Sequence, residues 1–164
     1  MREIKFQCIY RPTKEKFKPS KIDLINGNVF GNFDGELYDY CYFSLTPNGY
    51  GDAWLRQYTG LHDNTKWDEL TNQEQQEWLE TGKTKEEWEG KEIYEGDILK
   101  SQHGQIGRIQ WDESRLTYVV TWSAETSKFG EEYDSYLIRA IYKSKVIGNI
   151  YENPDLLGVS ECER

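Results

Sequence analysis

The sequence has no long hydrophobic run, and this absence excludes several classes of protein. Its longest apolar stretches are a few residues, such as Tyr118–Val120, far short of the ~20 residues needed to cross a bilayer. Residues 1–6 alternate charged and apolar side chains, so they lack the continuous apolar stretch of a secretory signal. We therefore expect a cytoplasmic protein with no membrane partner.

Metal-binding and catalytic motifs are also missing from the sequence. The three cysteines, Cys8, Cys41 and Cys162, are widely spaced and have only two histidines to join them, which argues against a zinc site or a disulfide framework. The sequence contains no phosphate-binding loop, zincin helix or dinucleotide fingerprint. We expect no metal, no cofactor and no enzymatic activity.

Two short polar motifs each allow a chemical and a structural interpretation. The carboxylates of Glu95–Gly96–Asp97 could share a cation, but nothing nearby offers further ligands. We interpret this motif as a turn in which Gly96 adopts a positive φ and Asp97 accepts backbone amides. His62–Asp63 resembles a general base with its orienting carboxylate, but no nucleophile motif accompanies it, and we interpret it as a loop pair.

Aromatic residues and acidic charge are what the chain has in quantity. Aromatic residues make up 15 % of its 164 residues and all hydrophobic residues 37 %, so Tyr, Trp and Phe must build much of the core of a single domain. The formal net charge is -9. Because binding to a phosphate backbone comes from Lys and Arg, any role with nucleic acid needs a local basic face.

Alternating residues predict strands at the N-terminal end. Residues 2–10 form a strand with one buried face, which consists of Ile4, Phe6, Cys8 and Tyr10. Residues 11–21 are basic and contain two prolines, so they form a loop. The dipeptide Asn26–Gly27 between two apolar runs predicts a hairpin with a two-residue turn.

The C-terminal half predicts a meander of short strands. From residue 91 onward, apolar runs of strand length alternate with turns that contain glycine. The last strands are expected at 136–142 and 145–151. Asn153–Asp155 ends the pattern, because Pro154 cannot donate a hydrogen bond to a sheet.

Residues 67–95 hold most of the net charge. Ten acidic residues stand against three lysines in this stretch. Thr71–Glu74 is a capping box, Thr84–Glu87 repeats it, and a glycine follows each run. The pattern predicts short helices over 72–81 and 85–89, anchored by Trp67, Leu70, Trp78, Leu79 and Trp88.

Two sets of side chains are candidates for binding a partner. The first is an acidic set, which can imitate the phosphate spacing of a nucleic acid. A run of charged residues is ordinarily a solvated helix face. The members of the acidic set are Glu74, Glu77 and Glu80. A second set interleaves cations and rings, as in a stacking platform for single-stranded nucleic acid, although rings in so aromatic a chain are more often core. Its members are Arg108, Trp111, Arg115, Tyr118 and Trp122.

Five motifs follow one another from the first residue to about Leu157. They are residues 1–6, Gln57–Leu61, Lys91–Ile98, Gly107–Asp112 and Ile147–Leu156. Together they resemble the YopX family of phage and prophage proteins. In that family only a few residues commonly separate the second motif from the third, so residues 64–90 look like an insertion. The resemblance implies a phage or prophage protein acting in the bacterial cytoplasm, and it brings no catalytic residue or cofactor.

The expected architecture is mainly β, or α+β by count. A glycine turn, a strand and Trp111–Asp112 resemble small SH3-like barrels, so we expect an SH3-like barrel at 91–157, an N-terminal β-rich portion at 1–63 and an inserted acidic helical hairpin at 64–90, all within one domain of residues 1–157. Residues 158–164 are expected to fray.

The expected function is that of a non-catalytic accessory protein that binds a host or phage macromolecule. Single-stranded nucleic-acid binding and acidic mimicry of nucleic acid are the alternatives, and an enzyme ranks behind them. Open sheet edges also make a homo-oligomer plausible.

Overall fold

The computed structural model describes residues 3–31, 42–45 and 53–157. The chain divides into two compact units, an N-terminal unit of Met1–Tyr58 and a C-terminal unit of Thr59–Arg164. In the described residues, strands in three antiparallel sheets dominate and are joined by two α-helices, which confirms the mainly β class. The predicted portions of a single domain stay a prediction. The expected frayed tail, residues 158–164, lies outside the described residues, as do Cys41 and Cys162.

Two small sheets enclose the core of the N-terminal unit. In one, β1 (Phe6–Tyr10) pairs on one side with β2 (Lys16–Phe17) and on the other with the first half of β6 (Ala53–His62). The other sheet contains β3 (Lys21–Asp23), β4 (Asn28–Phe30) and β5 (Tyr42–Ser44). Their shared core consists of Cys8, Phe17, Val29, Phe43 and Ala53.

The first strand differs from its predicted form. It begins at Phe6, and Ile4 is 73 % exposed. Cys8 and Ile9 point to opposite faces, yet both are fully buried, so the strand has no solvent-facing side at its centre. The reason is tertiary, because Lys16 and Trp54 lie opposite Ile9 on the two neighbouring strands and flank it on the second face.

The predicted hairpin exists, but its turn is longer than predicted. β3 ends at Asp23 and β4 begins at Asn28, so four residues connect the strands. The Asp23 carboxylate accepts hydrogen bonds from the backbone N–H groups of Ile25 and Asn26, at 3.1 Å each. This side-chain cap replaces the predicted two-residue turn, which needs a positive φ at both of its central residues. In the observed loop only Gly27 has a positive φ.

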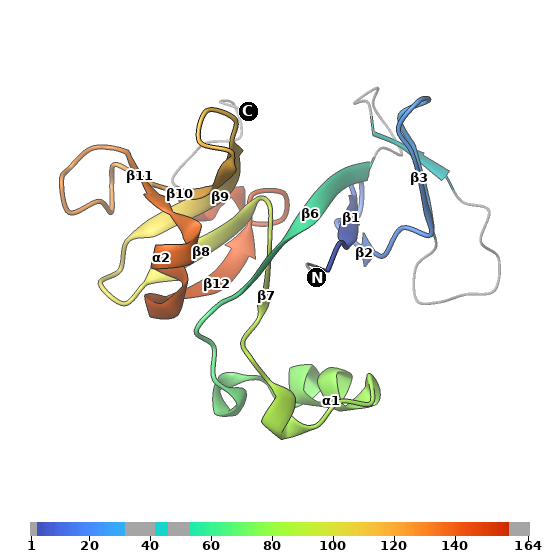
Figure 1. Ribbon diagram of the computed structural model, residues 1–164, viewed down its shortest axis with the longest axis horizontal. Helices are drawn as coiled ribbons and strands as arrows, with labels where there is room; N and C mark the ends of the chain where they lie inside the picture. Colours follow the sequence, from blue (N-terminus) through green and yellow to red (C-terminus); the bar gives the residue numbers. More distant parts are fainter. Residues whose placement is uncertain (1–2, 32–41, 46–52, 158–164) are drawn as a thin grey trace. The chain divides into compact units, whose positions relative to one another are not determined.

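A five-stranded antiparallel sheet forms the centre of the C-terminal unit (Figure 1). Four strands follow one another as a meander, and the last strand returns to pair with the first of them, which gives the order β11-β10-β9-β8-β12. The strands are β8 (Asp97–Ser101), β9 (Ile106–Asp112), β10 (Thr117–Trp122), β11 (Tyr133–Tyr136) and β12 (Ser144–Asn149). The described strands leave β11 and β12 at opposite edges and do not close into a barrel.

One predicted strand of this unit is wrong. Tyr136 ends β11, and the residues after it form the short helix α2 (Leu137–Ala140) and the 3₁₀ turn η3 (Ile141–Lys143). Leu137, Ala140 and Ile141 pack on the core at helical spacing, while Ile138 is 67 % exposed. A further 3₁₀ turn, η4 (Pro154–Leu157), follows β12.

The acidic segment connects β6 to β7 (Glu92–Tyr94), which pairs with β6 in the four-stranded sheet β2-β1-β6-β7. Between these paired strands lie η1 (Trp67–Glu69), α1 (Asn72–Glu80) and η2 (Lys85–Glu87), which extend beyond the strand ends (Figure 1). The first predicted helix is confirmed, together with its Thr71–Glu74 capping box. The second is a single 3₁₀ turn that ends at Glu87 rather than a helix to residue 89. In the part of the chain that the structure describes, no helix is long and apolar enough to cross a membrane.

Candidate functional site

Three tryptophans hold the helical segment together. The Trp88 ring meets Trp67 at a centroid distance of 6.1 Å and Trp78 at 5.1 Å, both edge to face. Two of the indole N–H groups form hydrogen bonds: Trp88 Nε1 donates to the Thr65 carbonyl at 2.9 Å and Trp78 Nε1 donates to the Thr84 carbonyl at 2.8 Å. The predicted tryptophan anchors thus form a small core of their own.

The two leucines predicted as anchors behave differently. Leu70 is buried, but Leu79 is 45 % exposed and anchors nothing. The reason is the helical period, because Leu79 follows Trp78 directly and projects to another side of α1.

Asp63 joins this segment to the sheet. Its buried carboxylate accepts hydrogen bonds from the backbone N–H groups of Thr65 (2.9 Å), Lys91 (2.8 Å) and Val146 (2.8 Å), and from the Thr65 hydroxyl (2.9 Å). These partners lie at the exit from β6, before β7 and in β12. One side chain therefore binds three stretches of chain together.

Two ion pairs add to this attachment. Lys145 of β12 pairs with Glu69, and Lys91 Nζ lies 3.1 Å from a Glu74 carboxylate oxygen. The Lys145 hydrogen bond lowers the pKa of Glu69. Partial burial would raise the pKa of Glu74, but the hydrogen bonds from Lys91 and Thr71 outweigh it and the pKa is lowered. Glu74 is thus a structural residue of the helix start.

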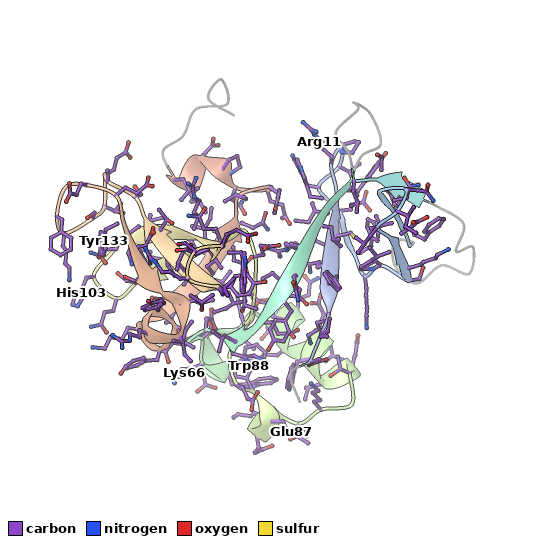
Figure 2. The ribbon with its side chains drawn as sticks, turned by 45° about the horizontal axis from the view of Figure 1, so that its top comes forward. Arg11, Lys66, Glu87, Trp88, His103 and Tyr133 are labelled. Carbon is purple, nitrogen blue, oxygen red and sulfur yellow. The ribbon has the colours of Figure 1, made fainter. Side chains whose placement is uncertain are left out.

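A hollow of about 310 Å³ lies where the segment meets the sheet. Its wall includes Lys66, Trp67, Lys85 and Trp88, with Glu86 and Glu89 among the acidic lining residues. Figure 2 shows Lys66 and Trp88 near each other, with Glu87 farther out on η2. The two tryptophans are half-buried and the two lysines exposed, so the hollow offers apolar walls inside a charged rim.

The other two predicted acidic residues are on the solvent side of α1. Glu77 accepts a hydrogen bond from Gln73 at 3.0 Å and Glu80 one from Gln76 at 3.2 Å. Both carboxylates are exposed. Asp68, Glu86, Glu87 and Glu89 are exposed on the same segment, and of these Glu86 and Glu89 line the hollow beside Lys66 and Lys85.

The sheet separates the predicted aromatic and basic set onto two faces. Trp111 and Tyr118 pair across β9 and β10, with ring centroids 5.0 Å apart, and lie on the core face with Trp122. Tyr118 and Trp122 are only 8 % and 4 % exposed. Trp111, at 38 %, is therefore the one ring of the three that solvent reaches well.

The two arginines of this set lie away from the core face. Arg108 is opposite Thr121, and none of the described residues offers a hydrogen-bond partner to its buried Nε. Arg115 pairs with Asp112 at 3.1 Å and with Asp134 at 3.5 Å. The five residues therefore do not form one platform of rings and cations.

The Glu95–Asp97 motif is a turn as interpreted, but the loop interpretation of the other pair is wrong, because His62 is the last residue of β6 and Asp63 is buried. Gly96 has a φ of +85°, and Asp97 accepts the backbone N–H of Tyr94 at 2.8 Å. The Asp63 carboxylate binds backbone groups, while His62 Nδ1 faces Glu89 at 3.9 Å. Within residues 3–31, 42–45 and 53–157, no three His, Cys, Asp or Glu side chains gather as a metal site requires.

Sequence reasoning missed the hollow and the role of Asp63. The local signal was Asp63–Asn64–Thr65, since an aspartate two residues before a threonine commonly caps backbone groups. Nothing local indicated that the partners of Asp63 would include Lys91 and Val146, which are distant in the chain.

Comparison with known proteins supports part of the sequence interpretation. The model of the YopX family, described as YopX protein, matches residues 80–158, which confirms the family resemblance over that stretch. The matched stretch begins at the end of α1, so the N-terminal motifs lie outside it. No curated protein matches the chain.

Among solved structures, one similar protein covers nearly the whole chain. It is the crystal structure of protein EF1440 from Enterococcus faecalis, with a TM-score of 0.50 and 20 % sequence identity over 96 % of this chain and 99 % of that one. At this identity the similarity concerns the fold alone.

Proposed function

We propose that this protein, a chain with a YopX region at residues 80–158, is a non-catalytic accessory protein that binds a basic macromolecule through its helical segment. Consistent with the family resemblance, we place it in a phage or prophage and in the bacterial cytoplasm. The observation that carries the proposal is that one segment presents exposed carboxylates together with a hollow lined by two half-buried tryptophans.

Several interactions stabilise the helical segment. The tryptophan core, the Asp63 hydrogen bonds and the two ion pairs fix it to the sheet, while its other carboxylates stay exposed. A surface that is already ordered loses little conformational entropy on binding. Half-buried tryptophans beside a hollow are typical of the residues that dominate binding energy at protein interfaces.

The negative charge indicates the chemistry of the partner. Lysine and arginine side chains on a partner would be attracted by the exposed carboxylates, and one apolar or long basic side chain would fill the hollow. Acidic mimicry of nucleic acid is one form of this proposal, in which the partner is a host protein that binds nucleic acid.

The test is an affinity pull-down from bacterial host lysate with the full chain, with and without nuclease. The variant Glu77→Gln/Glu80→Gln/Glu86→Gln/Glu87→Gln removes four exposed carboxylates from the segment. The matched control removes four exposed carboxylates elsewhere in the C-terminal unit: Glu113→Gln/Glu125→Gln/Glu131→Gln/Glu132→Gln.

We expect a retained protein that survives nuclease, and a loss of about tenfold or more in affinity for the segment variant only, as removal of several charges from an interface implies. Equal retention by both variants would reject the segment as the binding surface. Retention that disappears with nuclease would reject a protein partner.

The sheet supports a finer structural proposal. Four meander strands are followed by a helical turn and by a fifth strand that pairs with the first. We propose that this strand order is SH3-like. The outer edge of β11, which pairs only with β10 among the described strands, is where we propose that a second copy would add in a homo-oligomer.

A further inference from the structure

The β1–β2 hairpin of the N-terminal unit carries the densest positive charge of the sequence. Five of the 20 lysines and arginines fall within residues 11–21, where the only acidic residue is Glu15. All five are exposed: Arg11, Lys14, Lys16, Lys18 and Lys21. Residues 11–21 therefore concentrate exposed cations in a chain that is acidic as a whole.

Two of these cations lie over the ring of Trp54. Lys14 Nζ lies 4.4 Å from the centroid of its ring and the Arg11 guanidinium carbon lies 5.4 Å from it. The backbone of Lys14 has a φ of +65°, and its N–H donates to the Tyr10 carbonyl at 2.8 Å. The hairpin end thus holds both cations beside one half-buried ring (Figure 2 labels Arg11).

The strand register adds a third cation to the same face. Ile9 lies directly opposite Lys16 on β2 and opposite Trp54 on β6, and directly paired residues project to the same side of a sheet. The opposite face of this sheet is committed to the core through Cys8 and Phe17. Arg11 and Lys14 therefore lie at Trp54, and Lys16 lies on the same face of the sheet, separated from Trp54 by Ile9, on the side away from that core.

We propose that this surface binds the sugar–phosphate backbone of a single-stranded nucleic acid. Lysine and arginine side chains gain affinity by displacing counterions from phosphates, and an indole ring between them can stack an unpaired base. Most of the net charge of -9 comes from residues 67–95, which belong to the other compact unit.

The composition of the surface favours nucleic acid over an anionic membrane. Insertion of a surface segment into a lipid interface uses exposed apolar side chains beside the cations. The large apolar residue within 11–21 is Phe17, and it is only 5 % exposed, in the core. The exposed residues of the hairpin are polar, charged or proline, as a phosphate-binding surface requires.

The experiment is a fluorescence anisotropy titration of a labelled oligothymidylate with the full-length protein. The variant is Arg11→Gln/Lys14→Gln/Lys16→Gln. The control is Lys83→Gln/Lys128→Gln/Lys143→Gln, which removes three exposed lysines that also lie over rings, but in the C-terminal unit. A third protein, Arg11→Lys/Lys14→Arg/Lys16→Arg, keeps the charges, and thermal unfolding followed by circular dichroism verifies that all variants fold.

With three phosphate contacts on a single strand, the plot of log K against log salt concentration should have a slope of about -2 for the wild type. We expect the Gln variant to bind about tenfold more weakly at low salt, and the control and the charge-keeping variant to bind as the wild type does. Absence of wild-type binding at low salt, or equal weakening in the control, would overturn the proposal. Tighter binding to a duplex or to vesicles of anionic lipid would also overturn it.

Discussion

Gly90 lies directly against the main chain of Asp63. A Cβ atom at Gly90 would overlap the Asp63 carbonyl oxygen and lie 3.1 Å from its carbonyl carbon, and Gly90 has a φ of +114°. The next residue, Lys91, exchanges two hydrogen bonds with Asp63: its carbonyl accepts the Asp63 N–H at 2.9 Å and its N–H donates to the carboxylate at 2.8 Å. This contact closes the base of the helical segment.

The variant Gly90→Ala should therefore destabilise the protein strongly. Both the overlap with backbone and the unfavourable φ oppose the methyl group, and we expect a loss of about 2–4 kcal/mol in the free energy of unfolding. Urea denaturation measures it. The control is Gly82→Ala in the same segment, where φ is +89° but no atom lies within 4 Å, so only the backbone cost of about 1 kcal/mol applies.

Asp63→Asn should weaken the attachment of the helical segment to the sheet. The carboxylate accepts four hydrogen bonds, and an amide offers one acceptor oxygen while its NH₂ group faces donors. We expect a loss of about 2–3 kcal/mol in the free energy of unfolding, since buried donors are left unsatisfied. The exposed Asp68→Asn is the control, and an equal change in the urea midpoint of both variants would contradict this role for Asp63.

Cys8 should be inert in the folded protein and should make stability fall at high pH. Burial raises the pKa of its thiol to about 12 from an ordinary value of 9.0. Above pH 9 the unfolded chain loses this proton while the folded chain keeps it. The contribution to stability is thus complete below pH 9 and is lost progressively between pH 9 and 12.

The measurement compares wild type with Cys8→Val, a substitution that keeps the apolar contacts. We expect the difference in urea midpoint between the two proteins to shift against the wild type from pH 8 to pH 10. Alkylation read by mass spectrometry should modify Cys8 only after denaturant is added. Rapid modification of Cys8 in native protein would contradict its burial.

The helical segment should lose stability in acid through Glu74. Its pKa is lowered in the folded protein because the hydrogen bonds from Lys91 and Thr71 outweigh the opposing effect of burial. The stabilisation is therefore present above the ordinary value of 4.5 and is lost as the pH falls through the lowered folded pKa. Glu74→Gln should show a smaller decrease in urea midpoint between pH 7 and pH 3.5 than the wild type, and Lys91→Met should reduce that decrease in the same way.

Local chemistry made parts of the fold predictable. The Thr71–Glu74 capping box requires only residues within one turn of helix, and the structure forms it as predicted. The Gly96 turn likewise depends on a single positive φ and a nearby carboxylate. The strand predicted at 136–142 was wrong because its apolar residues fit both periods, and only packing of Leu137 on the sheet selects the helix.

The candidate sites were less predictable, because they depend on which face of a sheet a residue occupies. Tyr118 and Trp122 have the composition of a stacking platform, but the register with β9 directs both into the core. Trp54 and Lys16 are far apart in the sequence, and only their pairing with the two sides of β1 brings them to one face.

The sequence by itself determined the mainly β class, the acidic helical segment and its helix starts, because each depends on composition or on contacts between near neighbours. The family resemblance rests on the order of five motifs along the chain. The tertiary structure decided which aromatic residues are buried, where Asp63 finds its partners and where the cations gather. These depend on strand register and on contacts between distant residues, which no local pattern encodes.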